Sequence, residues 1–289
     1  MSTSPYIVHI NLSIQQMNIY VAIFIYVTGV IGSVLNIIIF TSLKTFRETS
    51  CGFYLIFTSF FNAGQTIFAL TTRILDSGFA INLTNTSWSC KVRTYLAQSF
   101  VLLSLTSMSL VTIDQYFSIS QYRRWSGLRL ARRNLIIGCL VWAFHGVAAL
   151  LYWDTPRGVC TMINHGYRTY IAYFYLPVLL GCLPIGVMMI FALLAFHRIR
   201  KPINQEIGVV RLSHDRQLTA MALSQVIFIL IGSLPFTIFN IYDLSTQKLS
   251  PEAMAEHRLI GTITVLLYYE NFAVSSMHER FDRSEQNLY

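Results

Sequence analysis

Long stretches without a charged residue alternate with short polar segments along the chain. Each charge-free or nearly charge-free stretch holds about 20 mostly apolar residues, which is the length of a membrane-spanning helix. The stretches have no alternating polar period, so they predict helices. The seventh contains one acid, Glu270. They are Ile19–Leu43, Thr49–Thr72, Thr94–Ile113, Asn134–Trp153, Thr169–Phe196, Gln217–Tyr242 and Leu259–Met277. The pattern predicts an all-α membrane protein, a seven-transmembrane helix bundle.

The composition agrees with this pattern and excludes a soluble enzyme. The chain has 289 residues, of which 54% are hydrophobic and 12% are charged. Soluble domains carry about 25% charged residues. We expect one domain: an N-terminal segment 1–18 outside the cell, the bundle over 19–277, and a short cytoplasmic tail 278–289. Segment 1–18 has no Lys or Arg, so the first helix is expected to direct its own insertion.

The basic residues predict the orientation of the bundle. With the N-terminus outside, 14 Lys and Arg residues fall on the inner side and 7 on the outer side. Cytoplasmic loops carry the excess of Lys and Arg, so we expect the N-terminus to be extracellular. The formal net charge of +8 is then explained by these loops, and no nucleic-acid partner is expected. Three Asn-x-Ser/Thr triplets, at Asn11, Asn82 and Asn85, all fall on the outer side as candidate glycosylation sites.

Two cysteines and one polar triplet mark the ends of the third span. Cys90 precedes this span, and Asp114-Gln115-Tyr116 follows 24 to 26 residues later. A helix of that length extends about 37 Å, enough to cross the membrane. Cys160 lies outside too, between the fourth and fifth spans, where disulfides persist. Free thiols at Cys90 and Cys160 are the alternative to disulfide-bonded cysteines. Cys51, Cys139 and Cys182 are expected to be ordinary buried residues.

This combination resembles the rhodopsin-like family of G-protein-coupled receptors. The resemblance implies a Cys90–Cys160 disulfide, an extracellular ligand, a heterotrimeric G protein that meets the inner triplet, and a multi-pass place in the plasma membrane. It covers about residues 19–283. The landmarks at the family's helix positions are Asn36, Asn62, Trp142, Pro184, Pro235 and Asn271.

Several of these positions depart from the family's pattern. Gln115 replaces the arginine of Asp-Arg-Tyr, Asn62 replaces an acid, and Asn271 begins Asn-Phe-Ala-Val-Ser instead of Asn-Pro-x-x-Tyr. Gly232 and Ser233 stand in place of a Cys-Trp pair before Pro235. Gln keeps hydrogen bonding but loses the charged guanidinium. We therefore hypothesise that a Gln115–Asp215 hydrogen bond replaces the family's ion pair; Asp215 as a solvated charge is the alternative.

The ligand pocket is expected between the outer halves of the helices. Ala97 stands where receptors for amines carry Asp, and the seventh span has no Lys for retinal, so both ligand classes are disfavoured. The candidate lining residues are Gln98, Val101, Tyr173, Tyr175, Phe236, Asn240 and Tyr268. For each of them, inward packing within the bundle is the alternative to contact with a ligand.

Acidic residues near the outer ends of the spans favour a peptide ligand, with a solvated rim as the alternative. They are Asp154, Asp243, Glu252 and Glu256. Glu270 is expected either to face Asn36 or Asn62, or to lie in a poorly formed span.

Other classes of protein fit the sequence less well. The catalytic and nucleotide-binding motifs of common enzymes are absent, so we expect no enzyme activity, no cofactor and no metal. A seven-helix transporter is the second class, although the chain shows neither repeated halves nor several intramembrane charges. A receptor-like protein that does not signal is the third.

Overall fold

The first span is a single helical stretch that begins earlier than the sequence predicted. A computed structural model of the chain describes residues 4–42, 49–120, 123–156, 158–200, 227–243 and 250–286. Helix α1 (Pro5–Gln16) continues through the π-helical segment η1 (Met17–Val21) into α2 (Ala22–Ser42). Proline suits the first turn of a helix, and no charge follows it before α2 ends. Helix therefore occupies most of segment 1–18; its extracellular location stays a prediction.

The second and third spans begin at threonine caps. Thr49 caps α4 (Ser50–Gln65) by accepting the Gly52 N–H at 3.1 Å, and Thr86 caps α6 (Ser87–Ile119) by accepting the Ser89 N–H at 3.4 Å. Such caps satisfy amides that have no partner inside the helix. After α4 the helical path continues through η2 (Thr66–Leu70), α5 (Thr71–Arg73) and η3 (Ile74–Gly78).

A short hairpin separates the fourth and fifth spans. The turn η4 (Arg123–Trp125) precedes α7 (Leu128–Tyr152). Strands β1 (Trp153–Asp154) and β2 (Thr161–Met162) then pair antiparallel, with Trp153 opposite Met162. The fifth span consists of α8 (His165–Tyr170), the π-helical η5 (Ile171–Cys182) and α9 (Leu183–Arg200). Pro177 lies inside η5, where its missing N–H suits the wider turns.

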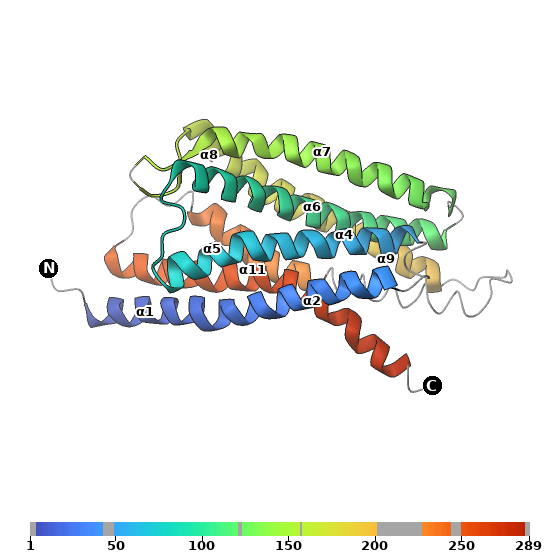
Figure 1. Ribbon diagram of the computed structural model, residues 1–289, viewed down its shortest axis with the longest axis horizontal. Helices are drawn as coiled ribbons and strands as arrows, with labels where there is room; N and C mark the ends of the chain where they lie inside the picture. Colours follow the sequence, from blue (N-terminus) through green and yellow to red (C-terminus); the bar gives the residue numbers. More distant parts are fainter. Residues whose placement is uncertain are drawn as a thin grey trace.

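The helices are long enough for the predicted bundle. Among the described residues, five stretches are long and apolar enough to cross a membrane: Pro5–Ser42, Ser50–Gly78, Ser87–Ile119, Leu128–Tyr152 and His165–Arg198. The helix Ile227–Asp243 is the described part of the sixth span. Helix α11 (Pro251–Gln286) contains the seventh. Figure 1 shows these helices side by side along the long axis, with the last turns of α11 leaving the bundle.

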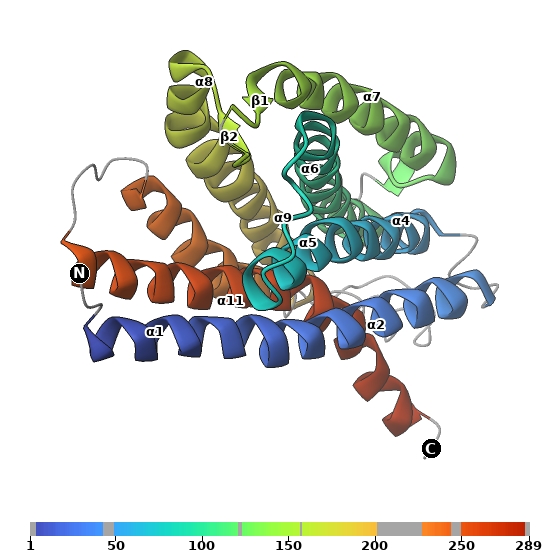
Figure 2. The same cartoon turned by 60° about the vertical axis from the view of Figure 1, so that its left-hand side comes forward.

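Helix α6 lies at the centre of the bundle and contacts α4, α7 and α9 (Figure 2). Leu102 of α6, Leu70 of η2 and Met188 of α9 are fully buried in one apolar core. Large apolar side chains such as Phe144 point outward instead, as expected for a surface that faces lipid. The core therefore forms around the helix that joins Cys90 to the Asp114 triplet.

The seventh span is regular helix, which answers the question posed by Glu270. Its side chain is exposed on the outside of α11, so it does not face Asn36 or Asn62. The next residue, Asn271, turns toward the interior instead. The expectation of an inward-facing acid was therefore wrong, and so was that of a poorly formed span.

Candidate functional site

A disulfide fastens the hairpin to the outer end of the central helix. Cys90 and Cys160 are bonded, with their Cα atoms 5.6 Å apart, which confirms the pairing that the resemblance implied. Lys91 adds an ion pair to Asp154 of β1 at 3.6 Å. The Ser87 hydroxyl, the Thr155 N–H and Lys91 hold the pKa of Asp154 below its usual value. The hairpin is thus fixed at the outer ends of α6 and α7.

Aromatic side chains fill the space below the hairpin. The Gln98 side chain of α6 lies 3.3 Å from the Tyr167 hydroxyl, and Tyr167 stacks on Tyr152 of α7 with centroids 5.0 Å apart. His145 of α7 makes a 2.7 Å hydrogen bond with the Tyr170 hydroxyl. Helices α6, α7 and α8 therefore meet in a region that combines aromatic faces with polar tips, a surface suited to ligands.

The candidate lining residues differ in where the structure places them. Val101 and Gln98 are buried on α6, and Tyr268 stacks on Phe236 with centroids 4.3 Å apart. Tyr173 is 70% exposed, away from these four. The wider turns of η5 direct Tyr175 inward in its place, where its ring lies parallel to His145 with centroids 5.9 Å apart.

Asn240 is half-buried, and its amide is engaged within its own helix. The Nδ2 group donates to the Phe236 carbonyl at 2.7 Å. The same helix presents the Phe236 ring to Tyr268. Asn240 therefore contributes to helix geometry in this conformation, while Phe236 contributes to the aromatic region.

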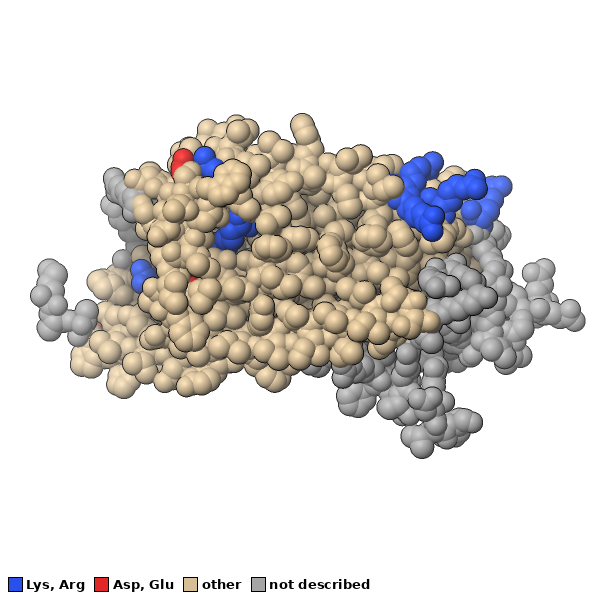
Figure 3. All heavy atoms as spheres, in the orientation of Figure 1, with Lys and Arg blue, Asp and Glu red and all other residues tan. Residues whose placement is uncertain are grey.

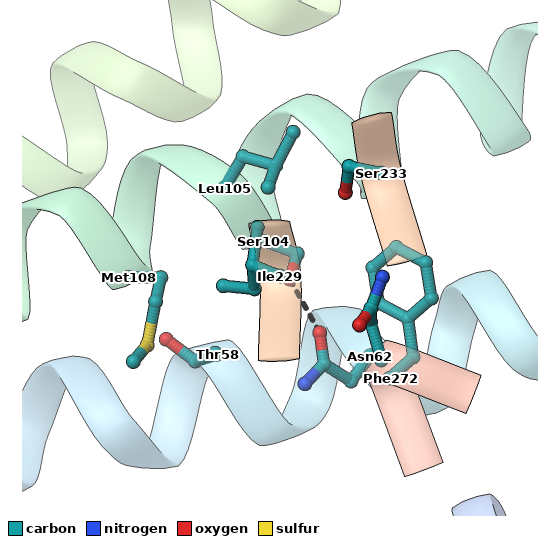
Figure 4. A pocket seen from close by; sticks show the side chains of 9 residues that line it. Thr58, Asn62, Ser104, Leu105, Met108, Ile229, Ser233 and Phe272 are labelled. Carbon is teal, nitrogen blue, oxygen red and sulfur yellow. Dashed lines mark hydrogen bonds between the residues drawn. The ribbon is translucent and has the colours of Figure 1, made fainter. Parts of the chain in front are cut away.

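A small cavity with an apolar wall and several polar side chains lies between α4, α6, the sixth span and α11 (Figure 4). Ser104 of α6 donates a hydrogen bond to Oδ1 of Asn62 on α4. Ser233 and Asn271 line the same cavity from the sixth span and from α11; the remaining lining residues are Thr58, Leu105, Met108, Ile229 and Phe272. Ser233 stands where the family's pattern has a tryptophan, so a small hydroxyl borders the space in place of a large ring.

Gly232 explains how Asn271 reaches this cavity. A Cβ atom added to Gly232 would lie 2.2 Å from Nδ2 of Asn271. A Cβ at this position would force the Asn271 side chain to move, so the glycine allows the amide its present place. The two departures from the family's pattern, at Gly232 and around Asn271, thus belong to one close contact between the sixth and seventh spans.

Three other landmark residues lie in the packed interior. Trp142 of α7 donates from Nε1 to the Thr106 hydroxyl at 2.8 Å and so ties α7 to α6. Asn36 of α2 is 2% exposed, and its Oδ1 has no hydrogen-bond partner within the described part of the chain. Pro184 is buried near the start of α9, inside the continuous helix His165–Arg198, where it lacks an N–H for the helical ladder.

The inner triplet contacts two neighbouring helices. The Ser50 hydroxyl of α4 lies 2.8 and 2.7 Å from the two oxygens of Asp114, which is 7% exposed. Gln115 donates from Nε2 to the Cys51 sulfur at 3.6 Å. Tyr116 turns the other way and packs edge-on against Phe191 of α9, with centroids 5.7 Å apart. The triplet therefore joins α4 and α9 at the inner end of α6.

The hypothesised partner of Gln115 cannot be placed. Asp215 lies outside the described residues, so the Gln115–Asp215 hydrogen bond stays a prediction. Within the described residues Gln115 reaches the first turn of α4 beside Ser50. Both polar residues of the triplet thus point toward the same turn.

The sequon asparagines are all exposed. Asn82 and Asn85 lie in the loop between η3 and α6, and Asn11 lies on α1. The Asn82 amide donates to the Gly158 carbonyl at 3.4 Å, which connects this loop to the hairpin loop. Glycosylation of the three stays a prediction.

Sequence reasoning missed two arginines. Arg73 and Arg93 were counted as outer-loop charges, yet they lie inside α5 and α6, and the Nε atom of each is fully buried. Arg73 directly follows the predicted span Thr49–Thr72 and Arg93 directly precedes Thr94–Ile113, and that position was the available signal.

The sequence match agrees with this architecture. Residues 83–274, about two thirds of the chain, match the family described as 7 transmembrane receptor (rhodopsin family). The chain belongs to this family of seven-helix membrane receptors. No curated protein matches the chain.

Proposed function

We propose that the chain is a plasma-membrane receptor that transmits binding of an extracellular ligand to an intracellular heterotrimeric G protein. The observation that carries this proposal is the central helix α6. Its outer end holds the disulfide-bonded hairpin and Gln98, and its inner end holds the Asp114 triplet. Family membership supports a receptor, and the packing around α6 links the two ends.

The charge distribution supports an extracellular N-terminus. In the face shown in Figure 3, basic side chains gather densely at the end of the molecule away from the N-terminus, beyond a broad uncharged belt. The arginines of η4 and of the start of α7 lie at that end. The positive-inside rule places it in the cytoplasm, and the disulfide at the other end then lies in an oxidising compartment.

Signalling needs two packings of the same bundle that the ligand distinguishes. The sixth span suits such a change, because Pro235 interrupts its hydrogen-bond ladder and Ser233 borders the cavity beside it. A ligand that binds better to the packing with an outward-swung sixth helix would open a cleft beside the triplet. We place the ligand against Gln98, Val101, Phe236 and Tyr268, with Tyr175 in place of Tyr173.

Ligand-dependent G-protein dissociation in cells tests this function. Wild-type protein, with its surface level measured, is challenged with a library of peptides and small acids. Any active compound is then applied to Gln98→Ala and to Tyr173→Ala, a matched control on the outer surface. We expect Gln98→Ala to weaken potency about tenfold, because one buried hydrogen bond is lost, and Tyr173→Ala to leave it unchanged. Equal loss in both variants, or silence of a well-expressed wild type, would contradict the proposal.

A further inference from the structure

Two arginines from neighbouring helices, Arg73 and Arg93, lie close enough to act on each other electrostatically. Arg73 ends α5, and Arg93 lies on α6 one turn below the disulfide. Arg73 donates from Nη2 to the Thr262 hydroxyl of α11 at 3.3 Å. Both guanidinium groups act electrostatically on Tyr269 of α11 and on each other. Three helices thus converge on one cationic spot.

The chain does not neutralise these two cations within its described part. The Nε atoms of Arg73 and Arg93 are buried without a hydrogen-bond partner, and no described carboxylate lies within 4.0 Å of either guanidinium. The nearby outer acids have other partners: Asp154 pairs with Lys91 and Asp243 with His257, each at 3.6 Å. The arginines therefore keep their charges uncompensated.

Holding two like charges near each other, each on a half-buried side chain with a buried Nε atom, is unfavourable unless an anion joins them. Guanidinium groups bind planar carboxylates and phosphates through paired N–H donors. The hydroxyl group of Tyr269 lies within electrostatic reach of both arginines as a further donor, whereas the Thr262 hydroxyl already donates to the Arg258 carbonyl at 2.9 Å. Tyr268 precedes Tyr269 on α11, contacts its ring, and stacks on Phe236 of the sixth span. The local surroundings therefore combine cations, a hydroxyl donor and an apolar wall.

We propose that Arg73 and Arg93 bind an anionic group, a carboxylate or a phosphate, of the receptor's ligand. The proposal rests on the proposed function for the identity of its occupant. It narrows the ligand class to compounds with an acidic group beside an aromatic or apolar body. A peptide fits through its C-terminal carboxylate, and a small organic acid or phosphate ester fits through the same chemistry.

The test is binding to the purified full chain in lipid nanodiscs, measured by thermal shift without a G protein. The probes are 3-phenylpropanoate and phenyl phosphate, against neutral 3-phenylpropanol and cationic 3-phenylpropylamine at equal ionic strength. We expect a saturable stabilisation by at least one anion at concentrations up to about 10 mM, and none by the alcohol or the amine. Which anion stabilises distinguishes a carboxylate ligand from a phosphate ligand.

Variants then assign the binding to the two arginines. Arg73→Gln and Arg93→Gln should each weaken the anion about tenfold or more, because a charge-assisted contact is lost. Arg73→Lys should retain part of the affinity. The matched control is Arg168→Gln, which removes an exposed arginine of α8 and should bind as wild type. The Gln variants should fold, since each relieves a like-charge contact.

Three results would overturn the proposal: no stabilisation of wild type by either anion, equal stabilisation by the alcohol, or unchanged binding in both Gln variants. Because the assay contains no G protein, its outcome is separate from that of the cell assay. Binding of an anion without signalling would contradict the receptor function. Signalling by a neutral ligand without anion binding would contradict only the proposal that the ligand carries an anionic group.

Discussion

The Ser50 hydroxyl lies 2.8 and 2.7 Å from the two oxygens of Asp114 and so joins the first turn of α4 to the inner end of α6. In the family's pattern the residue after this acid is an arginine, which supplies a charge next to it. Gln115 supplies none, and the buried carboxylate takes its hydrogen bond from α4 instead. Ser126, at 3.2 Å from Ser50, extends the contact to the segment before α7.

Removing the Ser50 hydroxyl should destabilise the inner end of the bundle. Ser50→Ala leaves a buried carboxylate without this donor, at a cost of about 1–3 kcal/mol. We expect a lower thermal midpoint of the purified protein in detergent. Ser126→Ala is the comparison: its hydroxyl reaches both Ser50 and the Asp114 carboxylate, with a smaller effect on the carboxylate than Ser50, so its loss should matter less. Equal midpoints for the Ser50 variant and wild type would show that the contact is energetically unimportant.

The contact between Gly232 and Asn271 should depend on the missing Cβ. Gly232→Ala forces the Asn271 amide out of place and should cost about 1–3 kcal/mol in unfolding free energy. The double variant Gly232→Ala/Asn271→Ala should recover most of this loss in the same thermal assay.

A second glycine provides the control for that experiment. A Cβ at Gly186 of α9 would meet nothing within 4 Å, so Gly186→Ala should be neutral or stabilising through helix propensity. A Gly232→Ala variant as stable as Gly186→Ala would refute the close contact.

The exposed position of Glu270 predicts that the acid is unfavourable for insertion. It lies inside the predicted seventh span Leu259–Met277, so the inserted helix would hold an exposed carboxyl group in the apolar part of the membrane. Glu270→Leu should favour the inserted state by on the order of 2–3 kcal/mol and raise the surface fraction measured by antibody labelling. Glu252→Leu, at the exposed start of α11, should have little effect. A fall in surface level for Glu270→Leu would mean that the acid makes a needed contact.

The Cys90–Cys160 disulfide should contribute more to the stability of the fold than any free cysteine does. Cys160→Ser opens a link between residues 70 positions apart, for which the chain-entropy model gives roughly 4 kcal/mol. We expect a lower thermal midpoint and a lower surface level. Cys182→Ser removes a free, exposed cysteine and should behave as wild type; a loss of similar size there would point to a general effect of the substitution.

The spans could be predicted because they depend on long-range regularities of the sequence, whereas the disulfide pairing was implied by the family resemblance. Charge-free runs fix the number of helices, and the distance from Cys90 to Asp114 fixes the ends of the third. The early start of the first helix could not be predicted in the same way, since polar residues such as Asn11 and Gln15 interrupt its apolar pattern.

Side-chain directions were harder to predict than helices. The wider turns of η5 rotate the fifth span, so Tyr175 faces inward where Tyr173 was also expected. The inward direction of Arg73 and Arg93 depends on how three helices pack, and the sequence of one helix does not contain that information. Glu270 and Asn271 are adjacent, yet only packing decides which of them faces the cavity.

Nucleotide exchange on a purified heterotrimeric G protein tests the central claim most directly. Wild type and Gln115→Arg are reconstituted in nanodiscs, and their folding is checked by thermal unfolding. The account predicts exchange above that of empty nanodiscs for Gln115→Arg, and a smaller increase for wild type, because the arginine restores the charged fork that the inner triplet lacks. Folded protein of both kinds that leaves exchange at the empty-nanodisc rate, with every G-protein class tried, would contradict G-protein coupling through this triplet.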